Sequence, residues 1–137
     1  MMRSQQHPLS TAVGCLALLP ICLAFAGPAR AEWVAVYANA EASFYIDPAS
    51  MRKEGALLKV AGLQDLKQRD VDRAMSRRAQ AEYDCQRSRY RLVSLVVYAE
   101  PMARGKVLWS MDANPDGWTT VPPGTGVDAI LELACTQ

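Results

Sequence analysis

The residues with the clearest chemical potential lie together in the stretch EYDCQRSRYR, which runs from Glu82 to Arg91. In this stretch Cys85 stands two positions before Arg87 and four before Arg89. Neighbouring arginines lower the pKa of a thiol, and the thiolate is the form that attacks electrophiles. The stretch therefore fits three interpretations: a reactive thiol, a basic surface for anionic partners, or a strand hairpin with a structural disulfide.

The N-terminal segment limits which of these chemistries the protein can use. The run TAVGCLALLPICLAFAG is apolar, and Ala29 and Ala31 follow it in the small-x-small spacing that signal peptidase recognises. We expect residues 1–31 to be a signal peptide that is cleaved after Ala31. A membrane anchor is the alternative, but the apolar run is short for a span and Pro20 interrupts it. The mature chain, residues 32–137, then has the length of a single small domain.

Removal of this leader leaves a mature chain without histidine, because His7 is the only histidine in the sequence. Histidine general bases, Ser-His and Cys-His nucleophiles and histidine metal sites are therefore not expected. The mature cysteines are Cys85 and Cys135, and an even pair in an exported protein most often forms a disulfide. We expect this disulfide, and the alternative is one reactive thiol and one buried thiol.

Three arginines of the same stretch, Arg87, Arg89 and Arg91, occupy alternate positions and would share one face of a strand that reached that far. They form either a partner-binding surface for acidic proteins or polyanions, or a solvated face whose charges pair with acids across strands. The nearby acids are Asp70, Asp72, Glu82 and Asp84. Nucleic acid is not an expected ligand, because removal of Arg3 and Arg30 leaves 13 basic against 14 acidic residues.

Those acids are also the remaining candidates for catalysis. Asp70 with Asp72, and Glu82 with Asp84, are pairs spaced two positions apart. Acid–base catalysis needs two carboxyl groups in different environments, whereas acids among arginines are usually solvated. The run DANPDG has the alternating oxygen ligands that begin a calcium loop, but it lacks the later glutamate. We predict no catalytic residue, no metal, no cofactor and no enzyme activity.

The sequence predicts that short strands joined by tight turns position these candidate residues. Alternating and β-branched apolar residues predict strands at 32–38, 43–46, 56–66, 77–84, 89–99 and 106–111. Asp47, Pro48 and Gly55 predict a helical turn or tight loop between the second and third strands. Residues 67–76 are expected to form an exposed loop. The Pro- and Gly-rich segment 112–126 is expected to wrap the surface with Trp118 as an apolar anchor.

The end of the chain predicts an amphipathic helix. Thr125 and Asp128 have the spacing of a capping box, and Cys135 near the end of the helix could tether it to Cys85. The residues expected on its apolar face are Val127, Ile130, Leu131 and Ala134. The expected fold class is therefore α+β: an antiparallel β-sheet of about six strands, a C-terminal α-helix packed on it, and one disulfide.

Several motifs in this order resemble the surface-adhesin protein E-like family of proteobacterial secreted proteins, over nearly all of residues 33–135. They are Trp33, YIDPASMRKEG at 45–55, Ser76, EYDCQRSRYR, MARGKVL, WTTVPPGTG and the Cys85/Cys135 pair. The resemblance implies an antiparallel sheet with a packed helix, a disulfide and no enzyme activity. The founding adhesin is a surface lipoprotein that binds host extracellular-matrix proteins. This chain has a plain cleavage signal instead, so no binding residue is carried over from the family.

We therefore predict a non-enzymatic, exported envelope module that binds a protein or polyanion partner, adhesion being one form of such binding. An extracellular-matrix protein or an envelope protein is the expected kind of protein partner. The alternative is a periplasmic structural or assembly protein with no host ligand. Export to the periplasm is the first expectation for its location, and the outer surface and secretion are the alternatives. No transmembrane segment is expected in residues 32–137.

Overall fold

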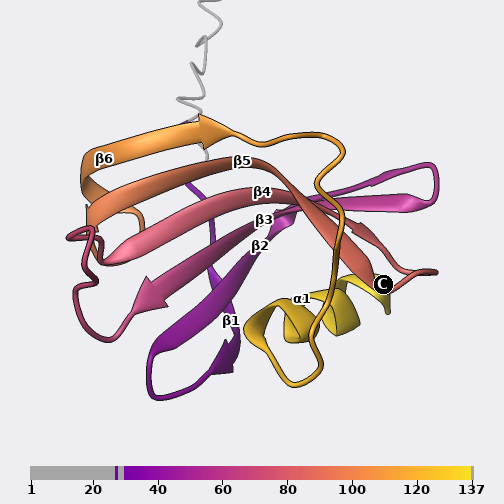
Figure 1. Cartoon of the computed structure of the whole chain (residues 1–137), viewed down its shortest axis with the longest axis horizontal. Coiled ribbons are helices and arrows are strands. Elements are labelled where there is room, and N and C mark those ends of the chain that lie inside the picture. Colours follow the sequence, from indigo (N-terminus) through magenta and orange to yellow (C-terminus); the bar gives the residue numbers. More distant parts are fainter. Residues whose placement is uncertain (1–26, 28–29, 137) are drawn as a thin grey trace, which may run out of the picture.

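The structure, a computed structural model, describes Gly27 and residues 30–136. Most of the predicted signal peptide lies outside this part of the chain. An antiparallel sheet dominates the described part, and its strands lie side by side in chain order (Figure 1). The strands of this path are β1 Val34–Ala38, β2 Ala42–Glu54, β3 Leu57–Leu66, β4 Ser76–Asp84, β5 Arg89–Glu100 and β6 Arg104–Asp112. A two-residue strand, β7 Thr119–Thr120, pairs with the beginning of β5.

A helix, α1 Gly126–Cys135, packs on β1, β2 and β3, away from β6 (Figure 1). Its N-cap is Thr125, whose hydroxyl accepts a hydrogen bond from the backbone N–H of Asp128, as the capping-box spacing predicted. The Asp128 carboxylate accepts from the N–H of Gly124, one residue before the cap. The predicted sheet of about six strands with a C-terminal helix is therefore confirmed.

The start of α1 lies directly against β2 because Gly126 has no side chain. A Cβ atom at this position would lie 2.4 Å from the ring of Phe44, closer than two carbon atoms can approach. The buried helix residues are Gly126, Ile130, Leu131 and Ala134, and Val127 is half-buried at the same interface. Ile130 and Leu131 join the core cluster with Ile46, Val60, Ala81, Tyr83 and Val121.

The helical turn or loop predicted after Asp47 is wrong, because β2 continues to Glu54. The pairing with β3 is interrupted only by an irregularity between Asp47 and Arg52. There the Ser50 hydroxyl donates to the Asp47 carbonyl and accepts from the Ala61 N–H at 2.8 Å. A side chain thus replaces the missing ladder bond, so the strand resumes, and Gly55, with φ +63°, makes the turn into β3.

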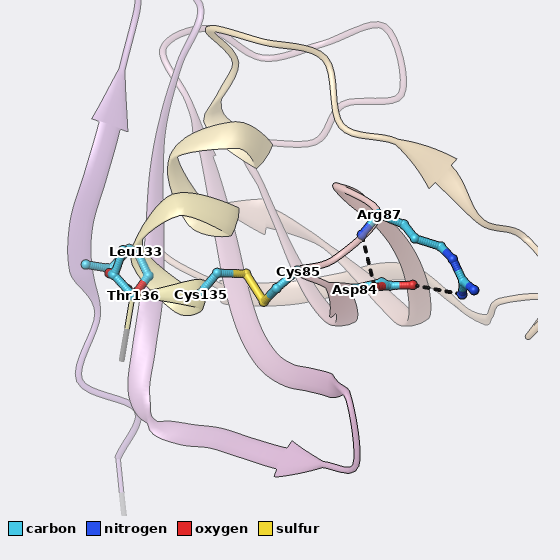
Figure 2. The surroundings of a disulfide bond; sticks show 6 residues. All are labelled: Asp84, Cys85, Arg87, Leu133, Cys135 and Thr136. Atoms are coloured by element: carbon cyan, nitrogen blue, oxygen red, sulfur yellow. Dashed lines mark hydrogen bonds and ion pairs between the residues drawn. A yellow bond between two sulfur atoms is a disulfide. The ribbon is translucent and has the colours of Figure 1, made fainter.

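The expected disulfide is present and joins two distant parts of the fold. Cys85 lies in the turn after β4 and Cys135 is the last residue of α1, 50 positions later (Figure 2). The bond therefore ties the C-terminal end of the helix to the turn between β4 and β5. None of the helices in the described part of the chain is long and apolar enough to span a membrane.

Replacing both cysteines, Cys85→Ser with Cys135→Ser, should lower the free energy of unfolding by about 4 kcal/mol. This is the chain-entropy value for a cross-link that closes a loop of this length. Urea unfolding followed by circular dichroism measures the change. Wild-type protein in excess reductant serves as the control and should show a similar loss. An unchanged unfolding midpoint in both samples would contradict the stabilising role of the disulfide.

Candidate functional site

The turn between β4 and β5 gathers the three candidate arginines around two acids. Arg89 and Arg91 lie on β5, directly opposite Asp84 and Glu82 of β4. Arg87 lies in the turn, because β5 begins only at Arg89. The three arginines therefore do not share one strand face. That arrangement would have required β5 to begin at Arg87 or earlier. They converge instead because the turn folds Arg87 back toward Asp84.

The carboxylate of Asp84 is the centre of this turn, and its side chain is only 5% exposed. It accepts a hydrogen bond from the backbone N–H of Arg87 at 3.2 Å and one from Nε of Arg89 at 3.1 Å. Nη1 of Arg87 lies 3.5 Å from the same carboxylate (Figure 2). Burial acts to raise the pKa of Asp84, but these hydrogen bonds and the two positive charges outweigh it, so the pKa lies below its ordinary value. Asp84 is therefore ionised in the folded protein.

A second acid, Glu82, holds the last of the three arginines. Nε of Arg91 donates to the Glu82 carboxylate at 2.6 Å, and Lys59 lies 4.0 Å from it. Another nitrogen of Arg91 donates to the carbonyl of Pro115, in the segment that follows β6. The charged face thus extends from β3 across β4 and β5 to the 113–118 segment.

Trp118 closes this cluster, because the guanidinium carbons of Arg89 and Arg91 lie 4.4 and 4.6 Å from its ring centroid. Cation–π contacts of this kind attract an arginine to an indole face. Two arginines therefore hold the ring of Trp118, which anchors the 113–118 segment.

These contacts decide how much of the basic surface is accessible. The side chains of Arg89 and Arg91 are 30% and 23% exposed, whereas that of Arg87 is 70% exposed. Of the three, Arg87 extends furthest into solvent. Cross-strand pairing with nearby acids, the more ordinary of the two interpretations of this stretch, is present for Arg89 and Arg91.

The other candidate acids are placed apart from this cluster. Asp70 binds the side chain of Arg77 and accepts from the N–H of Ala74 at 2.8 Å, so it shapes the loop between β3 and β4. Asp72 lies exposed in the same loop. In the run DANPDG, the Asn114 side chain accepts from the N–H of Asp116 and serves a turn. Within residues 30–136, no three or more His, Cys, Asp or Glu side chains come together as a metal site.

The edge strand β6 carries an exposed apolar strip that was not predicted from the sequence. Val107, Trp109 and Met111 of this strand are 47%, 42% and 45% exposed. Trp109 and Met111 stand opposite Val97 and Leu95 of β5. The alternation in KVLWSM predicted a strand, but only the strand order shows that β6 is at the edge and that these side chains are left uncovered.

Comparisons with known proteins agree on one family. Residues 33–136 match the family described as surface-adhesin protein E. Three solved structures of Haemophilus influenzae protein E share the fold. One has a TM-score of 0.57 at 16% identity and covers 79% of this chain and 86% of its own. Crystal form II gives 0.56 at 17% identity, with 79% and 90% covered. Protein E from the non-typeable organism gives 0.55 at 16% identity, with 79% and 78% covered. No curated protein matches the chain.

Neutralising the centre of the turn, by Asp84→Asn, should destabilise the protein at pH 7. The folded pKa of Asp84 is lowered, so its ionised form stabilises the fold above its ordinary pKa of 3.8, and this contribution is lost as the pH falls through the folded value. The stability difference between wild type and variant should therefore shrink below about pH 4. Urea unfolding at pH 7 and pH 3 measures it.

The exposed acid Asp72 provides the matched control for this experiment. Asp72→Asn removes the same charge from a loop and should leave the unfolding midpoint nearly unchanged at both pH values. The result would contradict the prediction if wild type and Asp84→Asn differed in stability by the same amount at both pH values. The charge of Asp84 would then not be what stabilises the turn.

Proposed function

Because the chain belongs to the surface-adhesin protein E family, we propose that it is an exported, non-enzymatic module of the cell envelope that binds a protein partner. The family match covers residues 33–136, nearly all of the predicted mature chain. We also propose that residues 1–31 are a signal peptide and that residues 32–137 form one domain. The fold shared with protein E supports the proposal of a single domain. The surfaces of this chain support the proposal of a protein partner.

The observation that carries the choice of a protein partner is the strip Val107, Trp109 and Met111 on β6. Tryptophan and methionine are enriched in protein interfaces, and a large aromatic side chain often supplies much of the binding energy. No strand of the described part of the chain pairs with the outer edge of β6. An extended segment of a partner can therefore add to this edge and cover the apolar strip.

The charged residues near the strip indicate which residues the partner's segment should carry. Arg104 and Lys106 are exposed at the N-terminal end of β6. A partner segment with an apolar centre and acidic residues at the end that meets these two cations would complement the edge in shape and charge. The proposed partner is thus a protein, of the extracellular matrix or of the envelope, that presents such a segment.

A polyanion is the less favoured partner because two of the three arginines are committed to internal contacts. Binding of a polyanion relies on several free cations that act together. Arg89 and Arg91 already contact carboxylates and Trp118, and this leaves Arg87 as the most available of the three. The proposal therefore assigns any partner-binding role of Arg87, Arg89 and Arg91 chiefly to Arg87.

A periplasmic structural or assembly protein without a host ligand is the second candidate, and the plain cleavage site predicted after Ala31 favours it. We propose the periplasm as the first location and the outer surface or the medium as alternatives. Such a protein could use the same β6 edge for a partner within the envelope.

Protease treatment of intact cells distinguishes the two candidates. A periplasmic protein should stay intact until the outer membrane is permeabilised, whereas a protein displayed on the surface should be degraded at once. Immunoblotting of the envelope fraction measures this, and a known periplasmic protein is the control. Degradation in intact cells whose control protein survives would exclude a purely periplasmic role.

Binding to a panel of immobilised extracellular-matrix proteins, with heparin as the polyanion probe, tests the partner. The Trp109→Ala variant should bind at least tenfold more weakly than wild type to the matrix protein that wild type binds, because it removes the central aromatic side chain. Val71→Ala is the matched control, since Val71 is an apolar residue that is 98% exposed elsewhere on the surface. It should leave binding unchanged.

The same assay contains the outcomes that would contradict the proposal. If Arg87→Ala abolished binding to heparin and Trp109→Ala changed nothing, the partner would be a polyanion. If wild type bound none of the probes, the matrix proteins of the panel and heparin would be excluded as partners. Circular dichroism of each variant shows whether the fold is intact.

A further inference from the structure

A cavity of about 220 Å³ lies between α1 and the sheet. Residues with small side chains form its base: Gly62, Ala79 and Ala81 are neighbours on β3 and β4. Ile130 and Val127 of α1 form one wall. The larger apolar residues around it are Phe44, Leu63, Leu92, Leu95, Tyr83 and Tyr90. The space exists beside Ile130 because small residues occupy these neighbouring strand positions.

The cavity adjoins a second hollow of about 170 Å³ under the segment that connects β6 to α1. Tyr90 and Leu92 line both spaces, and Ala113, Gly117 and Thr119 contribute from the connecting segment. In Figure 1 this segment runs from β6 to the start of α1, across the neighbouring strands. The sheet and the helix bound the cavity, and the connecting segment bounds the hollow beside it.

The size and lining of the cavity determine what it can hold. An empty apolar cavity of ~150 Å³ takes up benzene readily, because filling it restores lost dispersion contacts. A cavity of about 220 Å³ accommodates a slightly larger apolar body, of the size of two fused aromatic rings. A charged ligand would have to be desolvated at great cost in such a lining.

Two tyrosines, Tyr83 and Tyr90, bring hydroxyl groups to the lining, and Tyr83 is the more buried of the two. Tyr83 is 3% exposed and lines the cavity, and the side-chain hydrogen bonds of the described residues do not include its hydroxyl. Since no fully buried side-chain oxygen in the described part of the chain lacks a partner, this hydroxyl is accessible from the cavity. The ring of Tyr83 stacks on that of Tyr90 with 6.0 Å between centroids. Burial, together with the neighbouring Tyr90, raises the pKa of Tyr83, so the phenol stays protonated and can donate.

The amide and the guanidinium at the cavity, those of Gln64 and Arg77, bind each other. Arg77 donates to the Gln64 side chain at 3.2 Å and also binds Asp70. The positive charge at this end is therefore compensated, and it offers no free site for an acidic head group. Of the two tyrosine hydroxyls, we assign ligand selection to that of Tyr83, because it is the more deeply buried.

We propose that this cavity binds a small, uncharged aromatic molecule with one hydrogen-bonding group, which packs on Gly62, Ala79 and Ala81 and bonds to the hydroxyl of Tyr83. The site does not include the outer edge of β6 or the three arginines, although Leu95 of its lining stands opposite Met111 of β6. The proposal thus adds a small-molecule site to the protein-binding role, and neither depends on the other.

The pair 1-naphthol and naphthalene tests the proposal, since the two probes share one apolar body and differ by a hydroxyl. Fluorescence titration uses the protein purified from cells that express and export the full chain. Wild type should bind one 1-naphthol with saturation, and naphthalene about fivefold more weakly, the factor expected for one net hydrogen bond. Absence of saturable binding of both probes would overturn the proposal.

Two substitutions locate the site. Ala79→Leu should fill the cavity and reduce the affinity for both probes at least tenfold, whereas Gln80→Leu should not. Gln80 is the next residue of β4, directs its side chain to the other face and does not line the cavity, so it is the matched control. Equal affinity in wild type and Ala79→Leu would place the probes elsewhere and overturn the proposal.

Tyr83→Phe tests the hydrogen bond without changing the shape of the core. It should lower the affinity for 1-naphthol to that for naphthalene and leave naphthalene binding unchanged. Tyr90→Phe, which alters the stacked neighbour, is the control and should preserve the preference for 1-naphthol. Retention of the full preference in Tyr83→Phe would refute the role assigned to this hydroxyl, even if Ala79→Leu had failed to fold.

Discussion

At the turn between β4 and β5, a buried carboxylate has three partners: the backbone N–H of Arg87 and the side chains of Arg87 and Arg89. Asp84 is ionised in this position, so the turn is closed around a negative charge that only these groups can compensate. This geometry places Cys85 where it meets the end of α1, and it orients Arg89 toward Trp118. The disulfide and the anchoring of the 113–118 segment both follow from the same turn.

A helix of ten residues cannot be stable by itself in water, because isolated helices shorter than about 12–15 residues are marginal. In this protein it is held at both ends. The 113–118 segment, fixed through Trp118, leads into its start, and the disulfide holds its last residue. Gly126 and Ile130 then pack on β2 and β3, while small residues on β3 and β4 leave the neighbouring space open. The cavity thus lies beside the packed helix, where these small residues stand.

The structure separates the residues that stabilise the fold from those that remain available to a partner. Arginines beside a cysteine suggested a functional surface, yet Arg89 and Arg91 mainly connect strands and a loop. The exposed strip of β6 is more suited to contact with a protein, because its apolar side chains and the strand edge lie together. Both surfaces lie on a fold that the chain shares with protein E of Haemophilus influenzae.

The sequence alone was sufficient for the strands, the helix and its Thr125 cap, and the Cys85–Cys135 disulfide, because periodicity, capping residues and an even cysteine pair are local or compositional signals. The prediction after Asp47 was wrong, because the strand continues there through a hydrogen bond from the Ala61 N–H to the Ser50 hydroxyl. Ala61 belongs to another strand, so the local sequence does not reveal this bond. Only the tertiary structure decided which arginines are paired, that β6 is an edge, and that Gly62, Ala79 and Ala81 adjoin in a cavity. These properties depend on which strands are neighbours, and strand order results from contacts between residues far apart in the chain.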